Sequence, residues 1–346
     1  MQMSPHFAAS LPAPCAKSSS QVCALPARSD DRRAGAANRP PCSRVRILLT
    51  GISGSIGSAL APELARAGHE LRGFARASAR VRADAPVIRG DAISGAGLDE
   101  ALQGVDAAYF LIHSMEDADG FEQRERRAAE NFVAAADRAG VRRIVYLGAI
   151  VPERRRLSRH LSSRLEVERI LLTGAPEAVA LRASIVIGAR SRSFRFLVRL
   201  IERMSVLPLP GWRAHRTQPI DVRDVVSLLA AAATTPHARD GLSLDIAGPD
   251  VLSYEQMIAR IADLMLVRRR IVRFARDSTA IVAPIAAAVA GEDPTFVEAL
   301  METLSGDLLA RDGRAAELLG VRLHSYDRAV QSALREWESD ERLGAR

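Results

Sequence analysis

The sequence predicts an α/β protein built on a doubly wound parallel sheet, followed by a smaller C-terminal α/β lobe. Three observations support this fold class. Short aliphatic runs alternate with amphipathic stretches from Val45 onward, a glycine-rich turn follows the first run, and the alternation becomes irregular after about Ile185. Strands that alternate with helices require right-handed crossovers, which produce a parallel sheet with helices on both faces.

The first 43 residues differ in composition from the rest of the chain. They are rich in Ala, Pro, Ser and Arg without apolar periodicity, so we expect residues 1–43 to be disordered. No acid precedes Asp30, which faintly resembles an organelle transit peptide. The alternative is a flexible start in an arginine- and alanine-biased sequence, and a cytoplasmic location is then the simpler expectation.

Lysine and cysteine occur only in this segment. Lys17 is the only lysine, and the three cysteines are Cys15, Cys23 and Cys42. The folded part therefore cannot carry a P-loop lysine, a Schiff-base lysine or a Tyr-x-x-x-Lys pair. We expect no cysteine nucleophile, no cysteine-ligated zinc or other metal site, and no disulfide-stapled core, which suits a reducing cytoplasm.

The formal net charge of +7 is also concentrated near the N-terminus. Residues 1–44 carry six basic and two acidic side chains, which leaves +3 for the other 302 residues. Arginines alternate with acids over Glu122–Arg127 and Arg164–Arg169, a pattern typical of a solvated helix face. We therefore expect no nucleic-acid partner, and an oligomer is left open. No integral membrane segment is expected, because the apolar run Ala280–Ala290 is eleven residues long and contains Pro284.

The expected elements define a first domain over residues 44–185. Six aliphatic runs are expected to be strands: Val45–Leu49, Glu70–Ala75, Val87–Arg89, Ala107–Ile112, Arg143–Leu147 and Ala178–Leu181. Helical periodicity predicts helices over Ser55–Ala67 and Phe121–Ala139. Pro62 lies inside the first helix, where a proline costs about 3 kcal/mol or kinks the helix.

Residues 186–346 are expected to form a mostly helical lobe, with some segments returning to the first sheet. Pro208, Pro210 and Gly211 mark a loop. The expected elements are helix Val222–Ala232, strand Ser243–Ile246, helices Tyr254–Leu266 and Thr295–Leu309, and a closing segment Ala315–Glu338.

The sharpest motif is the glycine-rich turn between the first strand and the first helix. Gly51 allows a tight turn, Gly54 lets the backbone approach a pyrophosphate, and Gly57 lets the helix lie close to the strand. The helix N-terminus then offers free N–H groups to phosphates. This arrangement is that of a Rossmann dinucleotide-binding fold, and the residues predicted to hold the cofactor are Thr50, Gly51, Ser53, Gly54, Ser55, Ile56 and Gly57.

The end of the second strand favours NADP(H), with NAD(H) as the alternative. An NAD site usually has an acid there for the ribose hydroxyls, whereas this chain has Arg76, with Arg80 one turn later. An arginine at this position can pair with a 2′-phosphate. Asp91, just after the third strand, is placed to meet the adenine amino group, although aspartate is equally common in turns.

These motifs resemble those of the extended and atypical short-chain dehydrogenase/reductases. The likeness continues through residues 109–115, 140–148, 181–188, 218–225 and 247–254. As a set, these segments are similar to the YbjT-like NAD(P)-binding subgroup, which is close to NmrA-like proteins and to the Rossmann subunit of respiratory complex I. The resemblance implies a Rossmann domain with a substrate-side lobe and a nicotinamide cofactor.

The chain departs from the catalytic pattern that the resemblance implies. Standard members carry a Ser on the fifth strand and a Tyr-x-x-x-Lys helix, where the lysine lowers the tyrosine pKa. Gly148 and Ala149 stand at the serine position, and His160 and Arg164 stand at the Tyr and Lys positions. We expect His160 to move a proton near neutral pH and Arg164 to hold a ribose or substrate oxygen. The alternative is a surface helix with an exposed His and Arg.

Polar residues also follow the fourth strand. His113 and Ser114 end it at the carboxyl edge, where ligands of open α/β sheets bind, so we expect them to line the nicotinamide side. Leu111 is expected to border the cofactor. Further expectations place Asn131 on a helix surface, Arg182 near the mouth of the site, and Trp212 and Arg213 in a loop over the substrate.

Two functions remain open from the sequence. One is an NADPH-dependent oxidoreductase acting on an unidentified small conjugated or quinone-like acceptor, because hydride transfer needs mainly the cofactor and a positioned acceptor. The other is a non-catalytic NADP(H)-binding regulatory or structural protein, of the NmrA-like sensor or complex I-associated type. The missing Tyr and Lys favour the non-catalytic binding protein. The pairs His113–Ser114 and His160–Arg164 favour the oxidoreductase. A sugar-nucleotide epimerase ranks third, because its chemistry relies on the missing tyrosine.

Overall fold

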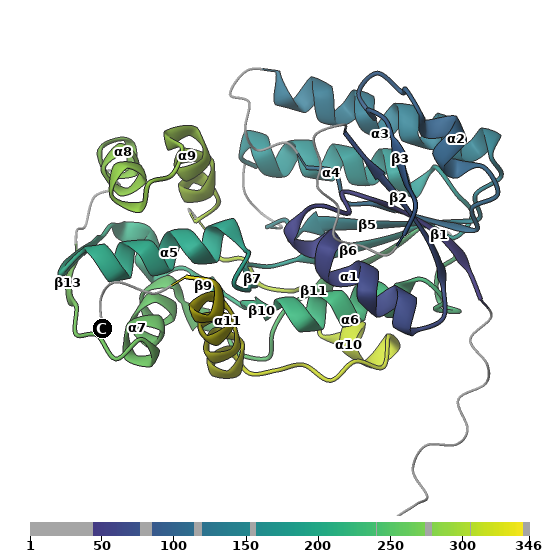
Figure 1. Ribbon diagram of the computed structural model, residues 1–346. Coiled ribbons are helices and arrows are strands. Elements are labelled where there is room, and N and C mark those ends of the chain that lie inside the picture. The colour runs from purple at the N-terminus through teal and green to yellow at the C-terminus, as the bar shows by residue number, and fades with distance from the viewer. Residues whose placement is uncertain are drawn as a thin grey trace, which may run out of the picture. The chain divides into compact units, whose positions relative to one another are not determined.

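The computed structural model describes residues 44–76, 85–113, 120–152, 157–239, 241–273, 279–304 and 306–341 (Figure 1). The segment 1–43, for which we predict disorder, lies outside these residues. Arg80 and Ser114 lie outside them as well.

A seven-stranded sheet dominates the first half of the chain (Figure 1). Its strands are β1 (Arg46–Thr50), β2 (Glu70–Ala75), β3 (Val87–Arg89), β4 (Ala107–Phe110), β5 (Arg143–Ala149), β6 (Val179–Ala183) and β11 (Leu242–Ile246). They lie in the order β11-β6-β5-β4-β1-β2-β3, and every neighbouring pair is parallel. The predicted doubly wound parallel sheet is confirmed.

The strand order reverses between β1 and β4. From β1 the chain runs outward through β2 to β3, and it then crosses back to β4 on the other side of β1. Ligands of open α/β sheets bind at such a switch point, in the crevice outside the carboxyl ends of the strands. The glycine turn after β1 and the segment after β4 flank this crevice.

Helices cover both faces of the sheet (Figure 1). One face carries α2 (Leu98–Leu102), α3 (Phe121–Arg138) and α4 (Arg159–Leu172), and the other carries α1 (Ser55–Arg66), α6 (Val222–Ala232) and α10 (Arg314–Leu318). On β1, Leu48 packs into the core under α2, α3 and α4, while Ile47 and Leu49 pack into the core under α1, α6 and α10. Successive strand residues point to opposite faces, so a strand covered on both sides is apolar throughout.

Helix α1 continues through Pro62. The proline removes one backbone hydrogen bond, at a cost of about 3 kcal/mol. Leu60 and Leu64 of the same helix are fully buried, and each contributes about 1.5–3 kcal/mol of apolar burial. Tertiary packing therefore offsets the local penalty.

The C-terminal lobe surrounds a third apolar core. Figure 1 shows the helices of this lobe. Its helices are α5 (Arg192–Arg203), α7 (Tyr254–Leu264), α8 (Thr279–Ala290), α9 (Pro294–Thr303) and α11 (Tyr326–Asp340). The lobe also contains the parallel pair β8 (Val206–Leu209) and β13 (Arg270–Arg273), and the 3₁₀ turn η1 (Gly211–Ala214). The smaller pieces are β7 (Val186–Ile187), β9 (Arg216–Thr217), β10 (Ile220–Asp221) and β12 (Leu252–Ser253). None of the described helices combines the length and apolar character that a bilayer crossing requires.

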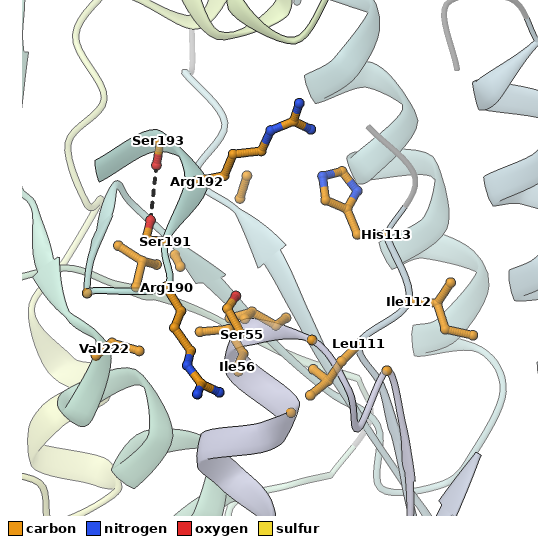
Figure 2. Close-up of a pocket in the computed structure, with 18 of the residues that line it drawn as sticks. Ser55, Ile56, Leu111, Ile112, His113, Arg190, Ser191, Arg192, Ser193 and Val222 are labelled. Atoms are coloured by element: carbon orange, nitrogen blue, oxygen red, sulfur yellow. Dashed lines mark hydrogen bonds between the residues drawn. The ribbon is translucent and has the colours of Figure 1, made fainter. Parts of the chain in front are cut away.

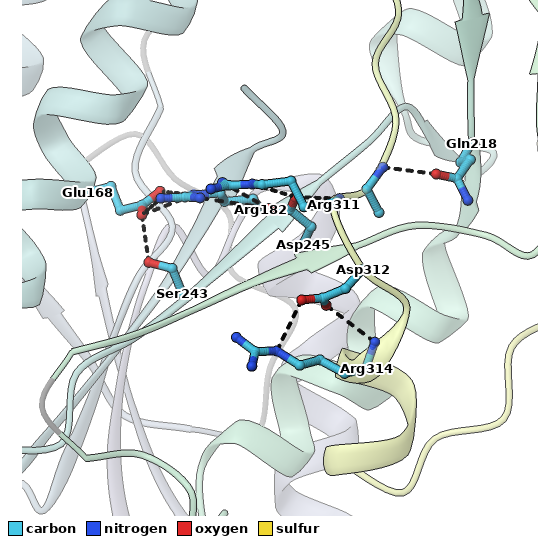
Figure 3. A network of polar contacts seen from close by, with 9 residues as sticks. Glu168, Arg182, Gln218, Ser243, Asp245, Arg311, Asp312 and Arg314 are labelled. Atoms are coloured by element: carbon cyan, nitrogen blue, oxygen red, sulfur yellow. Dashed lines mark hydrogen bonds and ion pairs between the residues drawn. The ribbon is translucent and has the colours of Figure 1, made fainter. Parts of the chain in front are cut away.

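A buried ionic network ties α4 to the sheet and to the C-terminal segment (Figure 3). Arg182 on β6 donates to Glu168 of α4 from Nε and Nη2, at distances of 2.6–3.0 Å. Ser243 donates to Glu168 Oε1 at 2.8 Å. Asp245 accepts from Nε of Arg311 at 3.1 Å and lies 3.8 Å from Nη1 of Arg182. The expectation that Arg182 reaches the mouth of the site is wrong, because its guanidinium is held inside this network.

Two acids are also buried in the segments Glu122–Arg127 and Arg164–Arg169, where arginines alternate with acids. Glu125 is 7% exposed and Glu168 is 2% exposed, although both segments were expected to be solvated faces. A helix that packs on a sheet turns one side inward, and an acid on that side stays ionised only when donors surround it.

Candidate functional site

A cleft of about 1150 Å³ lies at the carboxyl ends of β1, β4, β5 and β6. The predicted site residues that line it are Gly51, Ser53, Gly54, Ser55, Ile56, Gly57, Arg76, Asp91, Leu111, His113, His160 and Arg164. Figure 2 shows Ser55 and Ile56 at the start of α1, facing the segment Arg190–Ser193, with His113 on another wall. The fold thus brings together residues that are up to 113 positions apart, from Gly51 to Arg164.

The glycine turn has the shape that a diphosphate needs. Gly51 has φ +66°, and a Cβ there would lie 2.7 Å from the carbonyl oxygen of Leu111. A Cβ on Gly57 would lie 2.2 Å from the carbonyl oxygen of Gly51, so only glycine lets α1 approach so closely. Helix α1 begins with no side-chain cap on its first-turn N–H groups, which leaves them to a ligand. The turn therefore fits a pyrophosphate.

Thr50 is the one described residue of the predicted set that does not line the cleft. Its side chain is fully buried, and its hydroxyl donates to the carbonyl oxygen of Tyr109 at 2.8 Å. The same hydroxyl accepts from the Leu111 N–H at 3.1 Å. Thr50 therefore joins β1 to β4 at the switch point and holds Leu111 in position, instead of presenting its side chain to a ligand.

Arg76 lies at the end of β2, where a 2′-phosphate is expected. Its side chain is exposed, lines the cleft, and makes no hydrogen bond or ion pair with any residue that the structure describes. An arginine without an acidic partner is available to an anionic ligand.

The loop after β3 also lines the cleft. Asp91 accepts from the Ile93 N–H at 2.9 Å, as expected for an aspartate that forms a turn. Asp91 also lines the cleft. Asn131 of α3 donates to the carbonyl oxygens of Ala92 and Ile93 at 3.0 and 2.8 Å. The expectation that Asn131 is a plain surface residue is therefore wrong, because it holds this loop against α3.

A hydrogen-bonded chain of three residues, His113, Glu125 and Ser163, lies at the end of β4. Nδ1 of His113 lies 3.0 Å from Oε1 of Glu125, and Oε2 of Glu125 accepts from the Ser163 hydroxyl at 2.6 Å. Burial raises the pKa of Glu125, but the His113 and Ser163 hydrogen bonds and the charge of Arg164 together lower it to about 2. Burial and Arg164 lower the pKa of His113 to about 4. At neutral pH, His113 is thus neutral, donates Nδ1–H to the carboxylate, and keeps Nε2 as an acceptor.

His160 lies beside His113 and not on an exposed surface. Their ring centroids are 5.1 Å apart, and both rings line the cleft. Burial, Arg164 and His113 lower the pKa of His160 to about 3. The expectation that His160 titrates near neutral pH is therefore wrong, because a positive charge there would be partly buried and close to the Arg164 guanidinium. A neutral imidazole can still donate a hydrogen bond from its N–H.

Arg164 provides a positive charge at the base of the cleft. Its Nη1 lies 3.4 Å from both the Tyr146 hydroxyl and the Leu147 carbonyl oxygen. Within the described part of the chain, Arg164 forms no ion pair, and its buried Nε has no hydrogen-bond partner. An anionic or partly negative ligand atom would satisfy this side chain.

Sequence reasoning missed Glu125, Ser163 and Arg190. Glu125 and Ser163 lie on two different helices and have no spacing motif that links them to His113. Arg190 lines the cleft opposite the glycine turn, and its Nη1 lies 3.4 Å from Oγ of Ser58 (Figure 2). Its place just beyond the segment 181–188 is the only signal in the sequence that could have found it.

Comparisons with known proteins agree with this geometry. A family model described as NAD(P)H-binding matches residues 51–182. The chain is 25% identical over 146 residues to NADH dehydrogenase (ubiquinone) 1 alpha subcomplex subunit 9, a mitochondrial protein of Arabidopsis thaliana. That alignment covers 42% of this chain and 36% of the plant protein, so the match spans only about a third of the relative.

A bacterial relative matches over a longer stretch. It is the (4-alkanoyl-5-oxo-2,5-dihydrofuran-3-yl)methyl phosphate reductase of Streptomyces griseus, 26% identical over 232 residues that cover 63% of this chain and 73% of that protein. The solved structure of a short-chain dehydrogenase/reductase superfamily protein from Agrobacterium tumefaciens with bound NAD has a TM-score of 0.64 at 20% identity. That match covers 85% of this chain and 99% of the other. The glycine turn, the parallel sheet and these matches together show an NAD(P)H-binding domain over residues 51–182, in a fold like that of the short-chain dehydrogenase/reductase protein from Agrobacterium tumefaciens.

Proposed function

We propose that the chain is an NADPH-dependent reductase of a small conjugated or quinone-like acceptor. One observation carries the proposal: a single cleft is lined both by the glycine turn and by the cluster of His113, His160 and Arg164. A cofactor held by the first and an acceptor held by the second would therefore meet in one cavity. Arg76, without a partner among the described residues, supports NADPH over NADH.

The nicotinamide cofactor, when bound, supplies the hydride. The acceptor gains that hydride at a conjugated carbon, and negative charge then develops on its carbonyl oxygen. The Arg164 guanidinium and the N–H of neutral His160 line the same cleft and would stabilise this oxygen. A proton from water in the cleft completes the saturated ketone or the hydroquinone.

This reaction does not need the missing Tyr and Lys. Oxidation of an alcohol requires a base that removes the hydroxyl proton, and the low pKa of His160, about 3, makes it a poor base. Reduction of a conjugated acceptor requires mainly charge stabilisation. The name of the Streptomyces relative describes a ring C=C bond conjugated with a carbonyl group, which supports this reaction type.

A second candidate is a non-catalytic NADP(H)-binding protein of the regulatory or structural type. The similarity to the plant complex I subunit and the presence of Gly148 and Ala149 at the serine position favour it. It shares the cofactor site with the first candidate and differs only in lacking turnover.

Two measurements separate the candidates. NADPH fluorescence on titration reports binding, and loss of NADPH absorbance with a panel of quinones and enones reports turnover. We expect both, and binding without oxidation across the panel would support the second candidate. Absence of affinity for NADPH and NADH alike would overturn both.

Variants then test the assigned roles. His160→Ala and Arg164→Met should each lower kcat by about 10²–10³-fold, the usual effect of removing one oxyanion donor. NADPH affinity should stay close to that of the wild type in His160→Ala. Arg159→Met, on the same helix but paired with Glu122 at the surface, should leave turnover unchanged. Equal losses in all three variants would contradict the assignment.

A further inference from the structure

A second cavity of about 100 Å³ lies in the C-terminal lobe. We call it the apolar chamber, and its lining comes from α5, β8, η1, α7, α8 and α9. Phe196, Trp212, Met257, Ala286 and Met301 represent these walls. Side chains of the surrounding core do not fill this space.

The apolar chamber adjoins the cleft. Ile185, Ser193 and Leu300 line both cavities, so these three residues form the boundary that the two cavities share. Ser193 lies on the wall of the cleft that faces the start of α1 (Figure 2). A ligand bound beside His113 and His160 can therefore extend past Ser193 into the lobe.

The chemistry of the lining decides what this extension is. Apart from Ser193, the chamber is bounded by aliphatic, aromatic and methionine side chains, together with the indole of Trp212 and the ring of Tyr254. A charged or sugar-like group would lose its hydration there without compensation, whereas a hydrocarbon gains by leaving water. Met257 and Met301 can adjust to ligands of different shape, because the methionine side chain is flexible.

The volume of the chamber limits the size of the group. An apolar cavity of about 150 Å³ accepts benzene, so a chamber of about 100 Å³ accepts roughly four carbon atoms. We propose that the acceptor carries a short aliphatic arm, about four carbons long, which enters the apolar chamber while its conjugated carbonyl group stays beside His160 and Arg164. This inference rests on the proposed function for the identity of the reacting group, but not for the binding of the arm.

A homologous series tests the proposal. The probes are 1,4-benzoquinones with a 2-alkyl chain from methyl to hexyl. Their Kd is measured by tryptophan fluorescence with NADP⁺ present, so that no turnover occurs, and kcat/KM is measured with NADPH. Burial of each methylene should lower Kd about fourfold until the chain has about four carbons, and the gain should then stop.

A filled chamber provides the matched comparison. Ala286→Phe and the milder Ala286→Leu place a larger side chain on the chamber wall, and both should flatten the dependence on chain length while the methyl compound still binds. Ala288→Phe makes the same change at an exposed position of α8 and should keep the wild-type dependence of Kd on chain length.

The outcomes are distinguishable from those of the proposed function. A Kd that falls with each added methylene, without any turnover, would support binding of the arm in the apolar chamber and overturn the reductase proposal. Turnover with no dependence on chain length overturns the arm site and leaves the reductase proposal intact. Equal flattening in Ala286→Leu and Ala288→Phe also overturns the arm site.

Discussion

Oε1 of Glu125 lies 3.0 Å from Nδ1 of His113, and this contact joins a helix to the end of a neighbouring strand at the cleft. The carboxylate is buried and fixes the tautomer of the imidazole, because it can only accept a hydrogen bond. The contact therefore decides which ring nitrogen of His113 remains for a ligand.

The first prediction concerns this pair. Glu125→Leu leaves His113 and Ser163 without their buried partner, and each unsatisfied donor costs about 1–3 kcal/mol. Chemical denaturation should therefore show a loss of about 2 kcal/mol or more. The control is Glu122→Leu on the same helix, which removes only an ion pair with the largely exposed Arg159 and should cost less than about 1 kcal/mol. Similar losses in the two variants would contradict the role of Glu125.

The second prediction concerns pH. The folded protein holds the pKa of His113 at about 4 and that of His160 at about 3, whereas both titrate near 6.5 when unfolded. The unfolded chain then binds more protons between these values, so the free energy of unfolding falls as pH drops below about 6.5. Each histidine adds a slope of at most about 1.4 kcal/mol per pH unit. His160→Asn should reduce the slope between about pH 6.5 and 4, and His237→Asn at an exposed site should not. An unchanged slope in His160→Asn would show that its pKa is not lowered.

The third prediction concerns the glycine turn. Gly57→Ala places a Cβ 2.2 Å from the Gly51 carbonyl oxygen, so α1 must move away from the turn. Overpacking of this kind costs about 1–3 kcal/mol, and NADPH affinity should fall with it. Gly313→Ala is the control, since a Cβ there meets nothing within 4 Å. Thermal unfolding and NADPH titration would check both variants, and wild-type affinity in Gly57→Ala would argue against a pyrophosphate at this turn.

The fourth prediction concerns the choice of cofactor. Arg76→Ala removes the exposed guanidinium at the end of β2 and should weaken NADPH binding about tenfold or more, the usual value for a charge-assisted hydrogen bond. NADH affinity should stay the same. Arg89→Ala removes an exposed arginine from the adjacent strand and should change neither affinity. Calorimetric titration with both cofactors distinguishes the cases, and a parallel loss for NADH would exclude a 2′-phosphate contact.

The fifth prediction concerns the buried ionic network. Arg182→Met leaves Glu168 buried without its cation while Asp245 keeps Arg311, and breaking such a buried pair costs about 3–5 kcal/mol. Arg314→Met breaks only the exposed pair with Asp312 and should cost less than about 1 kcal/mol (Figure 3). Urea denaturation measures both, and a small loss in Arg182→Met would mean that the network contributes little to stability.

The bounds of the seven strands of the central sheet could be predicted from the sequence to within two residues. Strands β2 and β3 and helix α6 have the predicted bounds, and β4 is two residues shorter than expected. Helix α9 ends at Thr303, six residues before the expected end, and α5 and β13 were not predicted. α5, α9 and β13 lie in the C-terminal lobe. Helices and strands there are stabilised mainly by residues distant in the sequence, so apolar periodicity predicts their bounds less well.

The sequence alone determined the alternation of strands and helices and the glycine turn, because apolar periodicity and the conformational freedom of glycine are local properties of the chain. The resemblance to the short-chain dehydrogenase/reductases also predicted that Gly148, Ala149, His160 and Arg164 take the places of the serine, tyrosine and lysine. Only the tertiary structure decided that Glu125 holds His113, that His160 is neutral, that Arg182 is locked inside the protein, and that an apolar chamber adjoins the cleft. The physical reason is that burial, pairing and cavity shape depend on residues that are far apart in the chain and meet only after folding.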